Sequence, residues 1–331
     1  MSENTNTTKR RSAIQIMGSL IGLVKPLLHI MLAAIILGTL GYLCAIFLTI
    51  LAGQVIMHGL LTGVAGMIIP VDNMWRVFTP VKTIITVMIV IAVLRGILHY
   101  VEQYCNHFIA FKLLAIIRHK VFAALRKLCP AKLEGRDKGN LISIITTDIE
   151  LLEVFYAHTI SPIAIATLTS IIMVIFIGRY HWLAGVIALV AYLIVGVVIP
   201  MWNGKRGSQK GMEFRTNFGE LNSFVLDSLR GLDETIQYGQ GEKRKEQMSE
   251  HSKNLAGMQE SLSKMEGSQR SFTNMVILLA SFGMLALTIW LYDKGAMGFE
   301  GILTCTIAMM GSFGPVVALS SLSNNLNQTL A

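Results

Sequence analysis

Long apolar stretches alternate with polar, basic segments along the whole chain. Six of these stretches have the roughly 20 apolar residues that a helix needs to cross a bilayer core of about 30 Å. They are Leu27–Leu51, Val81–Val101, Thr159–Gly178, Trp182–Trp202, Ser271–Tyr292 and Ile302–Leu322. The pattern therefore predicts an all-α membrane protein with six transmembrane helices.

The polar segments after spans two and four are long, and their apolar residues recur at helical spacing. After span two, residues spaced three and four apart form one stripe: Leu114, Ile117, Val121, Leu125 and Leu128. This spacing predicts that span two continues as an unbroken helix for about 45 Å beyond the bilayer. The segments Lys205–Arg230 and Glu242–Arg270 have the same character, and we expect long helices there too.

Composition and charge agree with a membrane protein. Hydrophobic residues make up 53% of the chain and charged residues 15%, well below the quarter that is usual in soluble domains. With six spans, 23 Lys and Arg lie on the side of the N-terminus and the long loops, and 4 lie on the other. The positive-inside rule places both termini and the long loops in the cytoplasm, with the spans in the cell membrane. This distribution explains the net charge of +8 without a nucleic-acid partner.

Cysteine spacing gives no sign of a disulfide framework or of a zinc site. The four cysteines are scattered, and none forms a C-x-x-C pair: Cys44, Cys105, Cys129 and Cys305. No metal site is expected in this chain.

Span two carries polar residues that are unusual inside a membrane. Arg95, His99, Glu102, Gln103, Asn106 and His107 all fall within about 140° of one helix face. Polar side chains at this depth usually face a cavity or a partner, so the first five are candidates for lining a translocation pathway. The alternative is structural, because Arg95 and Glu102 are two turns apart and could pair with each other.

Span six contains a proline inside its apolar run. Pro315 removes one backbone hydrogen bond and predicts a kink in this helix. Gly311 and Gly314 next to it would let another helix approach closely.

Two segments in the long loops resemble the intracellular loops of ABC exporters. Leu133–Asp148 (LEGRDKGNLISIITTD) is similar to the first loop of that family, and Leu229–Glu242 (LRGLDETIQYGQGE) is similar to the second. In the family, each loop carries a short coupling helix that lies against a nucleotide-binding domain. The resemblance covers essentially the whole chain.

The resemblance implies an organisation for the chain and a partner. Residues 1–26 would form a cytoplasmic arm with an elbow helix, and residues 27–331 the six-helix ABC exporter domain, with coupling segments at about 137–148 and 229–240. The coupling residues would be Gly139, Leu141, Ser143, Asp148, Gly231, Glu234, Tyr238 and Glu242. Six spans make half of a twelve-span exporter, so a second half-transporter, identical or different, is expected.

Span two also resembles a narrower branch, the CydC-type subunits of cysteine and glutathione exporters. Six positions match the run typical of that branch: Arg95, Tyr100, Glu102, His107, Phe111 and Leu114. His99 and Gln103 stand where that run has arginine. The resemblance implies a thiol substrate such as cysteine or glutathione, and His107 as a possible haem ligand. Peptides, lipids and drugs remain open as substrates.

The chain contains no G-x-x-x-x-G-K-[ST] phosphate-binding loop, so this chain by itself is not expected to be an ATPase. We expect the nucleotide-binding domain, with its ATP and Mg²⁺, to follow residue 331. Two other classes of membrane protein fit the pattern less well. A six-span receptor would place its long helices after the last span, and a secondary transporter usually has inverted repeats, which are not evident here.

Overall fold

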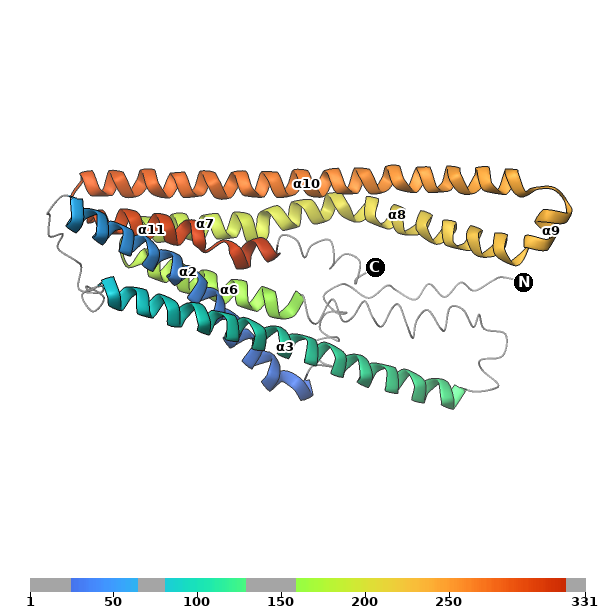
Figure 1. Cartoon of the computed structure of the whole chain (residues 1–331), viewed down its shortest axis with the longest axis horizontal. Helices are drawn as coiled ribbons and strands as arrows, with labels where there is room; N and C mark the ends of the chain where they lie inside the picture. The colour runs from blue at the N-terminus through green and yellow to red at the C-terminus, as the bar shows by residue number, and fades with distance from the viewer. Residues whose placement is uncertain (1–24, 65–80, 129–158, 320–331) are drawn as a thin grey trace, which may run out of the picture.

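The protein is a bundle of long helices. The computed structural model describes residues 25–64, 81–128 and 159–319, and every regular element within these ranges is a helix (Figure 1). Six helical segments there are long and apolar enough to cross a membrane: Lys25–Met57, Lys82–Leu128, Ser161–Gly178, Trp182–Trp202, Gly241–Asp293 and Phe299–Leu319. The predicted all-α membrane fold with six spans is confirmed.

The elements follow one another with few interruptions. Their bounds are η1 (Lys25–Leu27), α2 (Leu28–Val64), α3 (Val81–Leu128), α6 (Ser161–Gly178), α7 (Trp182–Leu193), η5 (Ile194–Val198), α8 (Ile199–Arg230), α9 (Leu232–Gln237), α10 (Gly241–Asp293) and α11 (Phe299–Gly311). α3 has 48 residues and α10 has 53, so both continue far beyond their apolar parts. α8 contains the third predicted segment, Lys205–Arg230, so the three predicted long polar helices are confirmed.

The first span is longer than the sequence pattern predicted. α2 continues from the expected end at Leu51 to Val64. The residues after Leu51 remain largely apolar and include no proline before Pro70, so nothing in them stops the helix.

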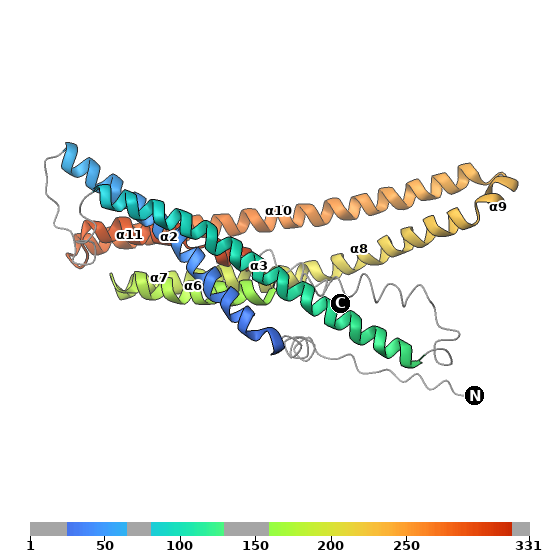
Figure 2. The ribbon, with the colours of Figure 1, turned by 60° about the horizontal axis from the view of Figure 1, so that its bottom comes forward.

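The two ends of the bundle differ, and we name them by their connections. At the short-loop end, α6 turns into α7 through Arg179–His181, and His181 Nδ1 accepts a hydrogen bond from Leu183 N (3.2 Å). At the long-helix end, α8 and α10 extend together and are joined by α9 (Figure 1). Figure 2 shows that the far end of α3 diverges from this pair. The predicted coupling segment at 137–148 and the first 24 residues of the predicted arm at 1–26 lie outside the described residues.

Two prolines change the helix geometry inside spans. Pro200 cannot donate to the Gly196 carbonyl, and the turn before it is the π-helical η5, in which Ile199 N donates to Ile194 O instead. Pro315 cannot donate to Gly311, where α11 ends; helical geometry resumes at 314. The sequence predicted a kink at Pro315, and the structure shows an interruption of the helix just before it, at residues 312–313.

The buried core is shared by α2, α6, α7, α10 and α11, in which α2 packs against α6 and α11, and α7 packs against α6 and α10. Its side chains are almost all aliphatic or methionine; the fully buried ones include Ile46, Ile50, Met173, Ile177, Met284, Leu291 and Met309. Two buried hydrogen bonds join helices within it. Gln54 Nε2 of α2 donates to Thr304 Oγ1 of α11 (2.8 Å), and the Tyr192 and Ser312 hydroxyls lie 2.5 Å apart. Polar bonds of this kind fix the register of helices that aliphatic contacts alone would leave adjustable.

The α6–α7 hairpin depends on a glycine pair. A Cβ added at Gly185 would lie 2.9 Å from Gly178 Cα and 3.3 Å from Val174 O, both of them backbone atoms that cannot move aside. Small residues at such positions let the backbones of two membrane helices approach closely. The pair therefore sets the spacing between spans three and four.

We expect Gly185→Ala to destabilise the protein, because the added methyl group forces the two backbones apart at a cost of about 1–3 kcal/mol. The matched control is Gly283→Ala in α10, where an added Cβ meets nothing within 4 Å; it should be neutral or stabilising by up to about 1 kcal/mol. Thermal unfolding in detergent, followed by tryptophan fluorescence, measures both. Equal melting temperatures for the two variants would contradict the close approach.

Candidate functional site

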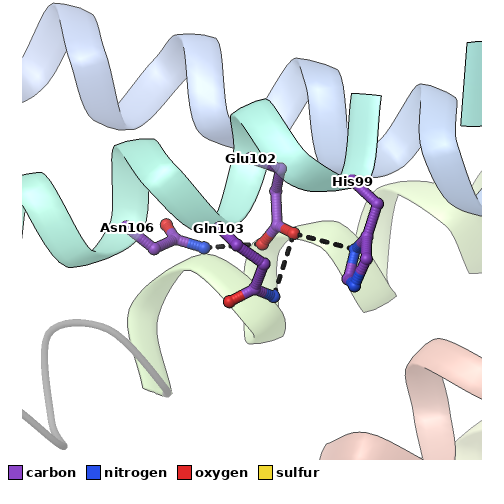
Figure 3. A network of polar contacts seen from close by, with 4 residues as sticks. All are labelled: His99, Glu102, Gln103 and Asn106. Atoms are coloured by element: carbon purple, nitrogen blue, oxygen red, sulfur yellow. Dashed lines mark hydrogen bonds and ion pairs between the residues drawn. The ribbon is translucent and has the colours of Figure 1, made fainter. Parts of the chain in front are cut away.

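A polar network lies on α3 at the level of the spans, centred on Glu102 (Figure 3). Its carboxylate oxygens bond to three side chains of the same helix. Asn106 Nδ2 donates to Oε1 (2.6 Å), Gln103 Nε2 donates to Oε2 (3.1 Å), and His99 Nδ1 lies 3.3 Å from Oε2. The carboxylate is thus surrounded by donors, which a buried acid in a membrane protein requires.

The network is buried on one side and open on the other. Glu102 and Asn106 are 4% and 3% exposed, whereas the His99 side chain is 61% exposed. The buried side packs on α2 and α6 at Gly38, where an added Cβ would lie 3.0 Å from Glu102 Cγ and would collide with Ile165. Glycine at position 38 is what allows the Glu102 side chain to lie between these helices.

Next to the network, a half-open groove of about 460 Å³ runs between α2 and α3. Small residues make most of its floor, and one tyrosine and two basic side chains contribute polar groups; the lining residues are Gly38, Gly41, Tyr42, Ala45, Ala92, Arg95, Gly96 and His99. Arg95 and His99 are both exposed on α3. The groove therefore offers a guanidinium, an imidazole and a phenol in a setting that is otherwise apolar.

The structure brings the predicted pathway residues together but changes one pairing. Within the described residues, the ion-pair partner of Glu102 is His99, one turn away, and not Arg95 as the structural alternative proposed. The reason is distance along the helix: Arg95 lies seven residues before Glu102, about 10 Å of axial rise. Arg95 instead lines the groove between α2 and α3.

Sequence reasoning missed the contribution of α2 to this groove. Gly38, Gly41 and Tyr42 belong to the first span, which was interpreted only as an apolar run. The signal was the spacing Gly38-x-x-Gly41, which leaves one face of the helix bare beside the polar face of α3.

His107, the predicted haem ligand, lies further along α3. Its ring is half-buried and stacks on Phe111, with ring centroids 6.1 Å apart and an interplanar angle of 27°. Arg95 is twelve residues away, about 18 Å along the helix.

The second predicted coupling segment forms a short helix at the long-helix end. Gly231 ends α8 and precedes α9, with its N–H donating to Asp227 O (2.9 Å). Glu234 lies in the first turn of α9, Tyr238 caps its end, and Glu242 pairs with Lys245 (3.7 Å). The residues of the first segment lie outside the described ranges: Gly139, Leu141, Ser143 and Asp148.

Large apolar side chains are exposed around α9. Leu229, Leu232, Ile236 and Tyr238 are 64%, 49%, 68% and 74% exposed, although this end of α8 and α10 is far from the apolar spans. A cluster of exposed apolar side chains on a polar segment is typical of a contact surface for another protein or domain.

Comparisons with known proteins agree with this architecture. The profile of the ABC transporter transmembrane region matches residues 27–316. A probable ABC transporter ATP-binding/permease protein of Haemophilus influenzae is 40% identical over 325 residues, which are 97% of this chain and 56% of the relative. The chain therefore spans about half the length of that relative.

More distant relatives carry more specific names. The ATP-dependent lipid A-core flippase of Escherichia coli (strain K12) is 25% identical over 247 residues, 72% of this chain and 40% of the relative. The glutathione/L-cysteine transport system ATP-binding/permease protein CydD of Bacillus subtilis is 22% identical over 166 residues, 49% of this chain and 28% of the relative. Because the family profile covers nearly the whole chain and the structure has its six spans, the chain belongs to the ABC transporter transmembrane region family.

Proposed function

We propose that this chain forms half of the translocation pathway of an ATP-driven exporter in the cell membrane. The observation that carries the proposal is that α8 and α10 continue from the spans as a helix pair and end in α9, with its exposed apolar side chains (Figure 1). A rigid pair of this kind transmits displacement at its tip to the membrane.

The motor is proposed to be a nucleotide-binding domain that follows residue 331. The Haemophilus relative is named as an ATP-binding and permease protein and is longer than this chain. The whole protein would then be an ATPase that couples hydrolysis to transport, working as a dimer with an identical or different half-transporter. The excess of Lys and Arg, 23 against 4, supports a cytoplasmic location for both termini and for the long-helix end.

The groove between α2 and α3 is proposed to lie on the substrate pathway. Glu102 accepts hydrogen bonds from Gln103 and Asn106 and contacts His99, and it forms no ion pair with Arg95. An arginine that lines a groove at membrane depth favours a substrate with an acidic group, since the bidentate pair of Arg with carboxylate or phosphate is strong. Cysteine and glutathione carry carboxylates, which supports thiols as the first candidates; an acidic lipid is the second, favoured by the flippase relatives.

The proposal is tested with the full-length protein and its partner in inside-out vesicles, supplied with ATP and radiolabelled glutathione. We expect ATP-dependent uptake, and Arg95→Gln should raise the half-saturating concentration roughly ten- to hundredfold, as for loss of a charged hydrogen bond. Arg95→Lys should retain part of the affinity, and Lys82→Gln, an exposed lysine of the same helix, should have no effect. A parallel assay measures ATP-dependent movement of a fluorescent phospholipid. Movement of neither compound would contradict the proposed substrates, and uptake without ATP would contradict the motor.

The proposed contact at α9 predicts a different defect. Ile236→Glu places a charge on the exposed apolar surface, and burying it against a motor domain without a partner is costly. We expect transport per ATP hydrolysed to fall roughly tenfold or more, corresponding to about 1.4 kcal/mol or more. Gln237→Glu adds the same charge to a neighbouring polar position and is the control. Equal coupling in the two variants would argue against α9 as the contact.

Haem ligation by His107 stays a prediction. A bound haem would supply a redox-active iron, and His107 would coordinate it. Arg95 lies about 18 Å away along α3. If His107 is the ligand, His107→Ala should abolish the Soret absorbance of purified, haem-loaded protein, whereas His119→Ala, an exposed histidine of the same helix, should not. A Soret band that survives His107→Ala would remove the assignment.

A further inference from the structure

The extensions of α8 and α10 form a helix pair with no buried core. Among the described residues of 207–237 and 241–272, no side chain is fully buried. Half-buried positions recur every three or four residues along both helices, such as Gly211, Phe214, Leu221, Phe224 and Ser228 in α8. A seam of this kind aligns the helices but contributes little burial, so the pair depends on a few specific contacts.

Three of these contacts lie at different levels of the pair. Trp202 and Phe272 meet edge to face at the level of the spans, with centroids 6.4 Å apart. Lys210 Nζ donates to Ser261 Oγ (3.2 Å) further out. Phe224 forms the third contact, near the far end.

Phe224 touches α10 through two side chains. Its ring lies 5.3 Å from that of His251, with an interplanar angle of 34°, and Arg244 Cζ lies 5.0 Å from its centroid. We call Phe224, His251 and Arg244 the tip cluster. Aromatic pairs and cation–π contacts each contribute specific geometry beyond the area they bury. A neighbouring phenylalanine, Phe218, stacks on Phe214 of its own helix instead (6.2 Å).

The tip cluster lies next to the two connections that hold α9. Gly231 follows Phe224 by seven residues, and Arg244 follows Gly241 by three. α9 has only six residues and is joined to its neighbours through Gly231, Gly239 and Gly241; Gly239 has φ +62°, where residues with a side chain are rare. Backbone hydrogen bonds cross both connections, from Gly231 N to Asp227 O (2.9 Å) and from Arg244 N to Gln240 O (3.0 Å). α9 is therefore tied to the ends of both α8 and α10, and its direction depends on how those ends are held together.

We propose that Phe224 is a positioning residue for energy coupling: held by His251 and Arg244, it fixes the ends of α8 and α10 and thereby the orientation of α9. The inference rests on the proposed function, because it assigns to the tip cluster the transmission of motor movement. Phe224 itself would touch neither substrate nor nucleotide.

The first experiment measures the geometry without nucleotide. Spin labels at Leu226→Cys in α8 and Ser249→Cys in α10, both exposed, report the tip distance in the full-length protein with its native cysteines replaced. We expect Phe224→Ala to reduce the population with the wild-type distance roughly three- to tenfold. Phe224→Tyr keeps the ring and should restore it, and Phe218→Ala is the matched control. An unchanged distance distribution in Phe224→Ala would overturn the proposal.

The second experiment measures transmission to the spans. Labels at Val93→Cys in α3 and Leu279→Cys in α10, both exposed, report the change in distance on addition of MgATP and vanadate. We expect Phe224→Ala to trap nucleotide as wild type does. The fraction of molecules in which the label distance changes should be three- to tenfold smaller than in wild type. Full response in Phe224→Ala would overturn the coupling role. If wild type itself shows no shift, the ATP-driven motor and the coupling role are both rejected, and the tip distance alone decides whether the cluster fixes the helix ends.

Discussion

The continuity of backbone hydrogen bonds from the spans into the polar extensions is the constraint on which the rest of this structure depends. In α3 and α10 the same ladder passes from apolar to charged sequence without a break, over 48 and 53 residues. The helix in hydrocarbon must satisfy its own backbone, and this rigid segment nucleates the polar part, which would be marginal alone. Distant polar segments are thereby placed at fixed positions relative to the membrane.

Two other spans have irregular backbone hydrogen bonding within the described residues. Each irregularity comes just before a proline: η5 before Pro200, and the end of α11 before Pro315. They lie in the spans that contribute Tyr192 and Ser312, whose hydroxyls are bonded to each other. The two irregular helices are thus held together by a polar contact in the core, close to both irregularities.

Charge is arranged differently in the membrane and at the tip. At Glu102, the cost of burying a carboxylate is offset by three donors from one helix, and Arg95 lines the neighbouring groove. At the far end of α8 and α10, Arg244 lies over an aromatic ring, and both helices remain largely exposed. In the bundle, the polar contacts satisfy the buried carboxylate of Glu102. At the tip, the contacts of Phe224 with His251 and Arg244 join two helices that have no buried core between them.

The amino-acid sequence by itself determined the six spans, the long helices and the irregularity at Pro315. These features follow from local properties: the length of apolar runs, the period of an amphipathic stripe and the missing N–H of proline. The segment that contains α9 was expected from the family resemblance alone. The sequence also identified the polar face of α3, because residues three and four apart share a face of any helix.

Only the tertiary structure decided the contacts between distant segments. The packing of Gly38 against Glu102 and Ile165, the bond between Gln54 and Thr304, and the packing of Phe224 on α10 depend on which helix faces which. No periodicity specifies this, since a glycine in a span can serve packing, a groove or nothing at all. The physical reason is that helix formation depends on residues a few positions apart. Packing depends on how well two helix surfaces fit, and those surfaces come from segments tens to hundreds of residues apart in the chain.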